Sequence, residues 1–155
     1  MSLEQAIYEV SLRMRLAKAI QDFRTNSGTE KLTEREVLLL ELLSEREGMS
    51  VLEVAAFFPG TADSTISAAL MRLWKEHGLI SKGIDMENPR ARVVALSEKG
   101  RKALQGIKRN SESRYGLLLE AISVTPKERT VLESVLERAL NYIDQRLGTV
   151  GKPPS

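Results

Sequence analysis

Two short apolar segments stand out in a chain whose other segments have helical periodicity, and they narrow the choice of fold most. Residues 79–84 and 91–96 have the pattern of strands. The connection between them, residues 85–90, holds Asp, Asn, Pro and further charged residues, which favour a turn. The sequence therefore predicts one β-hairpin within a mainly helical protein.

Three segments have the pattern of a helix start known as the capping box. They cover residues 33–36, 50–53 and 125–128, each with Ser or Thr followed three residues later by Glu. In this pattern the hydroxyl accepts a hydrogen bond from a first-turn N–H, and the carboxylate accepts one from the cap residue. Pro126 stands at the first helical position, where its missing N–H costs nothing. We expect a helix to begin at each of these places.

Apolar residues recur at helical spacing in two further segments. Residues 3–24 carry two apolar stripes, so this helix needs apolar partners on two sides. Residues 61–77 are predicted to form a helix that stops at Gly78. Its inner face is formed by Ile66, Ala69, Leu70 and Leu73, with Trp74 at the edge.

The predicted elements follow one another in an order that defines a fold class. A helix over 3–24, a helix after Thr33 and a short helix after Ser50 precede the helix 61–77 and the hairpin. A long helix capped by Ser97 and a last helix from Pro126 to Leu147 complete the chain. The short helix, the next helix and the hairpin form a winged helix-turn-helix, so we expect a mainly α fold with a small β-hairpin wing.

Composition removes several classes of function. The chain of 155 residues has no cysteine, which excludes disulfides and Cys-ligated zinc, and its single histidine, His77, argues against a metal site or a Ser–His triad. It shows no Gly-rich phosphate loop and no apolar run long enough to cross a membrane. The amino-terminal residues lack the features of a signal peptide. We expect a cytoplasmic protein that is not an enzyme and binds no cofactor, no metal and no membrane.

The charge distribution indicates where a polyanion could bind. The net charge is only +2, but residues 61–109 hold ten basic and five acidic residues. A local basic excess on a near-neutral chain is a modest electrostatic signature of nucleic-acid binding. A solvated charged surface accounts for it equally well.

Two local sequences resemble those of a known family. Ser64-Thr65-Ile66-Ser67 resembles the start of its recognition helix, and Gly78-Leu79-Ile80 with residues 85–100, ending in Leu96-Ser97-Glu98-Lys99-Gly100, resembles its wing. Together with the order of elements over nearly the full chain, they resemble the MarR family of bacterial transcriptional regulators. The chain departs from the family at the wing tip, Asn88-Pro89-Arg90, and at Ala68, and its turn at residues 58–63 is about one residue longer.

The resemblance implies a function and an organisation. Residues 33–100 would be the DNA-binding core of a single domain 1–155, residues 3–24 and 101–147 dimerisation helices, and 148–155 a flexible tail. The second helix of the motif would enter the major groove, with the wing beside it. The expected DNA-binding residues are Ser64, Thr65, Ser67, Ala68, Arg72, Lys82, Arg90 and Arg92.

The resemblance further implies the partners. We expect a homodimer that binds a pseudo-palindromic operator in double-stranded DNA, most simply as a repressor. A small amphipathic effector that releases the DNA is implied as well. The alternative is a winged-helix protein–protein interaction module, in which the same helix faces solvent and Arg72, Arg90 and Arg92 are ordinary exposed side chains.

Overall fold

The computed structural model describes residues 1–24, 32–46, 48–84 and 92–150, and the chain divides into two compact units. The first unit, Met1–Thr33, contains one helix, α1 (Leu3–Arg24), with the bounds that the sequence predicts. The second unit, Glu34–Ser155, contains the remaining elements. Along α1 both apolar stripes are largely exposed, with Leu3, Ile7, Tyr8, Val10, Leu12, Leu16 and Ile20 all more than two-fifths accessible.

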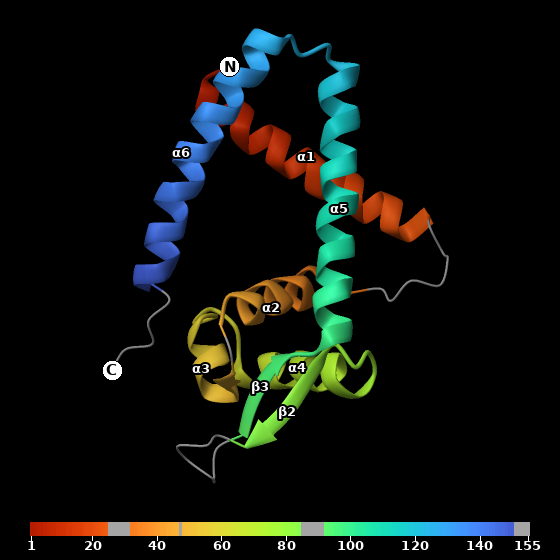
Figure 1. The fold of residues 1–155 in the computed structure, drawn as a ribbon, viewed down its shortest axis with the longest axis vertical. Coiled ribbons are helices and arrows are strands. Elements are labelled where there is room, and N and C mark those ends of the chain that lie inside the picture. The colour runs from red at the N-terminus through yellow and green to blue at the C-terminus, as the bar shows by residue number, and fades with distance from the viewer. Residues whose placement is uncertain (25–31, 47, 85–91, 151–155) are drawn as a thin grey trace. The chain divides into compact units, whose positions relative to one another are not determined.

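The second unit begins with the predicted winged helix-turn-helix, whose helices and strands lie together in Figure 1. It consists of α2 (Glu34–Glu45), β1 (Met49–Ser50), α3 (Val51–Ala56), α4 (Asp63–Lys75), β2 (Ile80–Ile84) and β3 (Arg92–Leu96). The hairpin β2–β3 is confirmed, and β1 joins it to give an antiparallel sheet in the order β1-β3-β2. The sequence did not predict β1, because two residues are too few to show the alternation of a strand.

The core lies between α2, α4 and the sheet. The inner face predicted for α4 is confirmed, since Ile66, Leu70 and Leu73 are at most 1% exposed and Ala69 is half-buried. Its partners from the other elements are Leu39, Leu40, Leu43, Val54, Leu79, Ile80, Val94 and Leu96.

The helix α4 begins two residues later than predicted. Ala62 occupies the cap position with φ −60° and ψ 140°, and it has no side-chain oxygen to accept a first-turn N–H. The helix ends at Lys75, two residues before its predicted end at residue 77. The predicted stop at Gly78 is confirmed, since Gly78 has φ +64°, the left-handed conformation that stops helices. The next residue, Leu79, donates its N–H to the Leu73 carbonyl at 2.8 Å, which turns the chain into β2.

Two long helices follow the sheet, α5 (Glu98–Ala121) and α6 (Pro126–Val150). The predicted cap at Ser97 is confirmed, since its Oγ accepts the Gly100 N–H at 3.0 Å. Lys108 on α5 pairs with Glu41 on α2 at 2.9 Å. Helix α6 extends three residues beyond its predicted end, and residues 151–155 of the expected tail lie outside the described residues.

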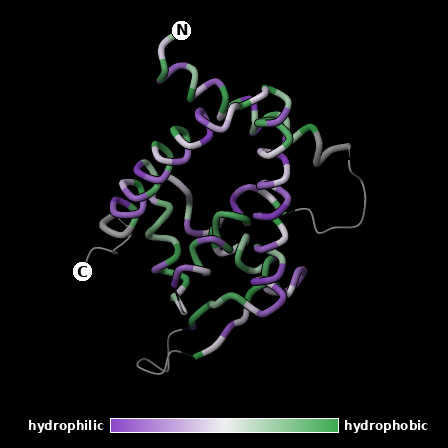
Figure 2. Tube along the Cα trace, turned by 45° about the horizontal axis from the view of Figure 1, so that its top comes forward, coloured by the Kyte–Doolittle hydropathy of each residue, from purple (hydrophilic) through white to green (hydrophobic). Residues whose placement is uncertain are grey.

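Helix α6 exposes most of its apolar residues. Figure 2 shows hydrophobic positions recurring along the coloured part of this helix. The large apolar side chains that are more than two-fifths exposed are Val131, Leu132, Val135, Leu136, Leu140, Tyr142, Ile143 and Leu147.

The first turn of α5 lies against the segment that follows α4. The Leu79 carbonyl accepts the Ser97 N–H at 3.0 Å, and a Cβ added at Gly100 would lie 2.0 Å from the same oxygen. Gly100 is therefore the residue that allows this close approach of two backbones. This accounts for the glycine in the Ser97-Glu98-Lys99-Gly100 sequence.

We expect Gly100→Ala to destabilise the fold by about 1 to 3 kcal/mol, the usual cost of overpacking, despite a gain of about 1 kcal/mol in helix propensity. The clash dominates because the nearest atom is a backbone oxygen that cannot rotate away. Urea unfolding of both proteins measures the difference. Gly106→Ala is the matched control, because nothing lies within 4 Å of its added Cβ and the propensity gain should appear alone.

The capping box at the start of α6 predicts a pH dependence. The Thr125 N–H donates to Glu128 Oε2 at 2.8 Å and the Glu128 N–H donates to Thr125 Oγ1 at 3.3 Å, so the box is complete. The bonds from the Thr125 backbone and side chain lower the pKa of the Glu128 carboxyl below its ordinary 4.5. Because the folded pKa is depressed, this stabilisation is present above pH 4.5 and is lost as the pH falls through the folded value.

We expect Glu128→Gln to lose stability relative to the wild type at pH 7 and to approach it at acidic pH, where the wild-type carboxyl is also neutral. Unfolding free energies of the two proteins between pH 3 and 7 test this. A difference that stays constant across this range would contradict it.

Candidate nucleic-acid interface

The outer face of α4 presents small polar and apolar side chains to solvent. Ser64, Thr65, Ser67 and Ala68 are all exposed, and they lie away from the buried face of the helix. Hydroxyls of this kind can hydrogen-bond to base edges or phosphates, and a methyl group can contact a thymine methyl. Met71, 40% exposed, continues the same surface toward the end of the helix.

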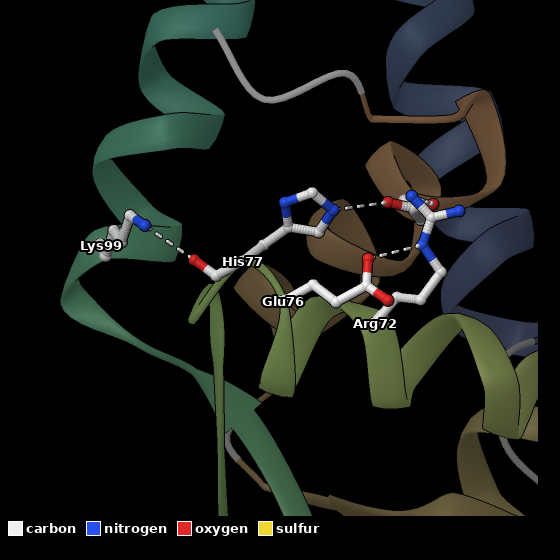
Figure 3. A network of polar contacts seen from close by, with 5 residues as sticks. Arg72, Glu76, His77 and Lys99 are labelled. Carbon is white, nitrogen blue, oxygen red and sulfur yellow. Dashed lines mark hydrogen bonds and ion pairs between the residues drawn. The ribbon is translucent and has the colours of Figure 1, made fainter. Parts of the chain in front are cut away.

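Arg72, a predicted DNA contact, is held by two carboxylates. Its Nη2 lies 3.7 Å from Glu36 Oε1, and its Nε lies 3.5 Å from Glu76 Oε2, while its side chain remains 46% exposed (Figure 3). The guanidinium charge is thus largely compensated within the protein. A contact of Arg72 with DNA stays a prediction, and any such contact would compete with these ion pairs.

Glu36 is a functional-site neighbour that sequence reasoning missed. Its side chain is 3% exposed, although it lies in the first turn of α2, and its Oε2 faces His77 Nε2 at 3.8 Å. A buried carboxylate is costly unless basic groups and hydrogen bonds surround it. Because Glu36 is the Glu of a capping-box pattern, the sequence predicted that it would be exposed, and the structure shows it buried. The ion pair with Arg72 and the contact with His77 tie α2 to the end of α4.

The end of α4 is also bonded to the start of α5. Lys99 Nζ donates to the His77 carbonyl at 2.8 Å, and Ser97 Oγ donates to the Gly78 carbonyl at 2.7 Å (Figure 3 shows the Lys99 bond). An ammonium group at this point also interacts favourably with the carboxyl-terminal end of the helix dipole. These bonds set the orientation of α4 on the rest of the unit.

The wing places two predicted residues on one face of the hairpin. Lys82 lies opposite Val94 and Arg92 lies opposite Ile84, and paired residues of an antiparallel hairpin share a face. Lys82 Nζ lies 4.5 Å from the centroid of the Trp74 ring. Arg92 is exposed, and Arg90 lies outside the described residues.

Among the described residues, no group of three or more His, Cys, Asp or Glu side chains is placed to hold a metal ion. None of the helices, as far as they are described, combines the length and apolar character that crossing a membrane requires.

We expect Arg72→Ala to reduce stability as well as any DNA affinity, because it removes a cation from a buried carboxylate. Since the guanidinium is half exposed, the expected loss is roughly 1 kcal/mol. Glu36→Gln/Arg72→Ala should recover part of it, and the two single variants and the double variant form a cycle that measures the coupling by urea unfolding. Strict additivity would show that Arg72 and Glu36 do not interact.

Comparison with known proteins identifies solved structures of the same fold. No protein-family model matches the sequence, and no curated protein is significantly similar to it. The structure superimposes on a crystal structure of MarR with a TM-score of 0.66 and 23% identity, covering 96% of this chain and 95% of the other.

Two further solved structures give the same result. A mutant of MepR from S. aureus matches with a TM-score of 0.68 and 16% identity over 92% of this chain and 99% of the other. FabT from Streptococcus pneumoniae, solved in complex with DNA, matches with a TM-score of 0.63 and 13% identity over 93% and 99%. The chain therefore has the winged helix-turn-helix fold of the MarR-family regulators.

Proposed function

We propose that this protein is a sequence-specific DNA-binding transcriptional regulator that acts as a homodimer. The observation that carries the proposal is the outer face of α4, where exposed hydroxyl and methyl groups lie beside a hairpin that bears basic residues. A helix fits the major groove, in which base edges distinguish all four base pairs. Structures of FabT and of a MepR mutant with DNA support the same use of this fold.

The residues divide into two roles. Ser64, Thr65, Ser67 and Ala68 face the bases, and basic residues of α4 and the wing contact phosphates. Phosphate contacts set the position of the protein and the salt dependence, whereas base contacts select the sequence. The predicted set for these roles remains Ser64, Thr65, Ser67, Ala68, Arg72, Lys82, Arg90 and Arg92.

The homodimer is proposed from the apolar surface of the terminal helices. Val131, Leu132, Val135 and Ile143 lie on one side of α6 and are 44% to 62% exposed, and Tyr115 and Leu117 near the end of α5 are exposed as well. Contiguous apolar surface of this kind marks protein interfaces. A two-fold dimer joined through residues 3–24 and 101–147 would carry two copies of α4, and its operator would be a pseudo-palindrome.

Repression and its release are the finer part of the proposal. A regulator of this kind responds to a small amphipathic ligand only if the ligand binds more tightly to the conformation whose two helices α4 misfit the operator. The resemblance to the MarR family supports this mode of release. The proposal assigns no residue to the effector.

We expect the purified protein to enrich a pseudo-palindromic duplex from a random library, with affinity that falls as salt rises. Each phosphate contact adds about 0.9 to the slope of log K against log salt. Ser64→Ala/Ser67→Ala should weaken binding to the enriched duplex more than to random DNA, because the hydroxyls act on bases. No enrichment and no salt-dependent binding by folded protein would favour the protein–protein interaction module.

We expect Ile143→Glu to convert the dimer to a monomer at micromolar concentration, since a charge in the middle of the apolar side of α6 would be buried without a partner. Asn141→Glu is the matched control, because Asn141 lies on the opposite side of the same helix. Light scattering measures the mass of both variants and of the wild type. A monomeric wild type would contradict the homodimer.

A further inference from the structure

The only tryptophan of the sequence lies at the junction of α4 and the wing with two lysines beside it. Lys82 Nζ lies 4.5 Å from the centroid of the Trp74 ring, and Lys75 Nζ lies 5.5 Å from it. Both distances are within the range of about 6 Å in which an aromatic face attracts a cation. Trp74 is 37% exposed, so the cluster lies at the surface.

The two lysines and Arg72 have different partners within the protein. Arg72 lies between two carboxylates, whereas no Asp or Glu in the described part of the chain forms an ion pair with Lys75 or Lys82. An aromatic ring attracts an ammonium group through its quadrupole and carries no net charge. Within the described residues, the two ammonium groups therefore lie against an uncharged ring and not against a carboxylate, which leaves them available to an external anion.

The cluster lies beside the proposed base-reading surface. Ser64, Ala68, Met71 and Lys75 follow one another at steps of four, three and four residues, which places them along one line of the helix. Lys82 comes from β2 and shares its hairpin face with Arg92. Trp74 thus brings together one ammonium from the helix and one from the wing.

We propose that Trp74 is a positioning residue that holds Lys75 and Lys82 as a pair of contacts to the phosphate backbone of duplex DNA. The proposal rests on the proposed DNA-binding function and specifies which cations supply its electrostatic part. Lys75 and Trp74 are not among the residues that the sequence predicted. The anion is a backbone phosphate because the pair borders the face of α4 that would lie in the groove.

The first part of the test measures the cluster without DNA. Trp74 fluorescence reports on the ring alone, because the chain has no other tryptophan. Iodide, an anion, should quench wild-type Trp74 more than it quenches Lys75→Gln/Lys82→Gln, while neutral acrylamide should quench both equally. Equal iodide quenching would show that the ammonium groups do not stay near the ring and would overturn the proposal.

The second part measures DNA affinity against salt, by the anisotropy of a labelled duplex enriched from the library. Lys75→Gln/Lys82→Gln should lower the slope of log K against log salt by about 1.8, at about 0.9 for each lost phosphate contact. Trp74→Leu should lower the slope partly, and Trp74→Phe, which keeps an aromatic face, should restore it. Lys127→Gln on α6 is the matched control and should leave the slope unchanged.

The outcomes separate this proposal from the proposed function. Salt-dependent binding by the wild type with an unchanged slope in the double lysine variant would overturn the role of the pair and leave the function standing. A Trp74→Leu variant that loses affinity at an unchanged slope would show a merely structural ring. Wild-type protein that binds no duplex would overturn both proposals. If inorganic phosphate protected Trp74 from iodide quenching to the same extent as duplex DNA, the cluster would be a site for free anions and the proposal would be overturned.

Discussion

The close approach of α5 to the segment after α4 is the constraint on which the winged unit depends. The Leu79 carbonyl accepts the Ser97 N–H, and Gly100 leaves room for that oxygen where any Cβ would collide with it. The Ser97 hydroxyl and the Lys99 ammonium bond to the two preceding carbonyls, at Gly78 and His77. The end of α4, the start of β2 and the first turn of α5 are therefore fixed to one another by hydrogen bonds to three successive backbone carbonyls.

A second group of contacts fixes the other side of α4. The buried Glu36 carboxylate faces Arg72 and His77, so the last turns of α4 are attached to α2 by charge as well as by apolar packing. Burial makes this attachment specific for one arrangement of α2 and α4, because a buried carboxylate is stable only next to its basic partners. A helix held on both sides presents its outer face in one orientation, which sequence-selective contact with a rigid duplex requires.

The basic residues around α4 fall into two classes that their sequence positions do not reveal. Arg72 compensates carboxylates of the protein, and Lys99 bonds to a helix terminus, so both contribute to the fold. Lys75 and Lys82 interact with an uncharged ring, and no carboxylate in the described part of the chain pairs with them. Arg72, which the sequence predicted as a DNA contact, thus forms ion pairs within the protein, whereas the sequence did not predict a role for Lys75.

The sequence by itself determined the order of the helices, the β-hairpin and several of the helix ends. Capping at Ser50, Ser97 and Thr125, the stop at Gly78 and the buried face of α4 all follow from local hydrogen bonding and periodicity, which involve residues within one or two turns. Only the tertiary structure decided that Glu36 is buried against Arg72, that Lys82 reaches Trp74 and that Gly100 borders Leu79. These contacts join residues of different helices and strands, and they depend on how those elements pack, which no pattern within a single element encodes.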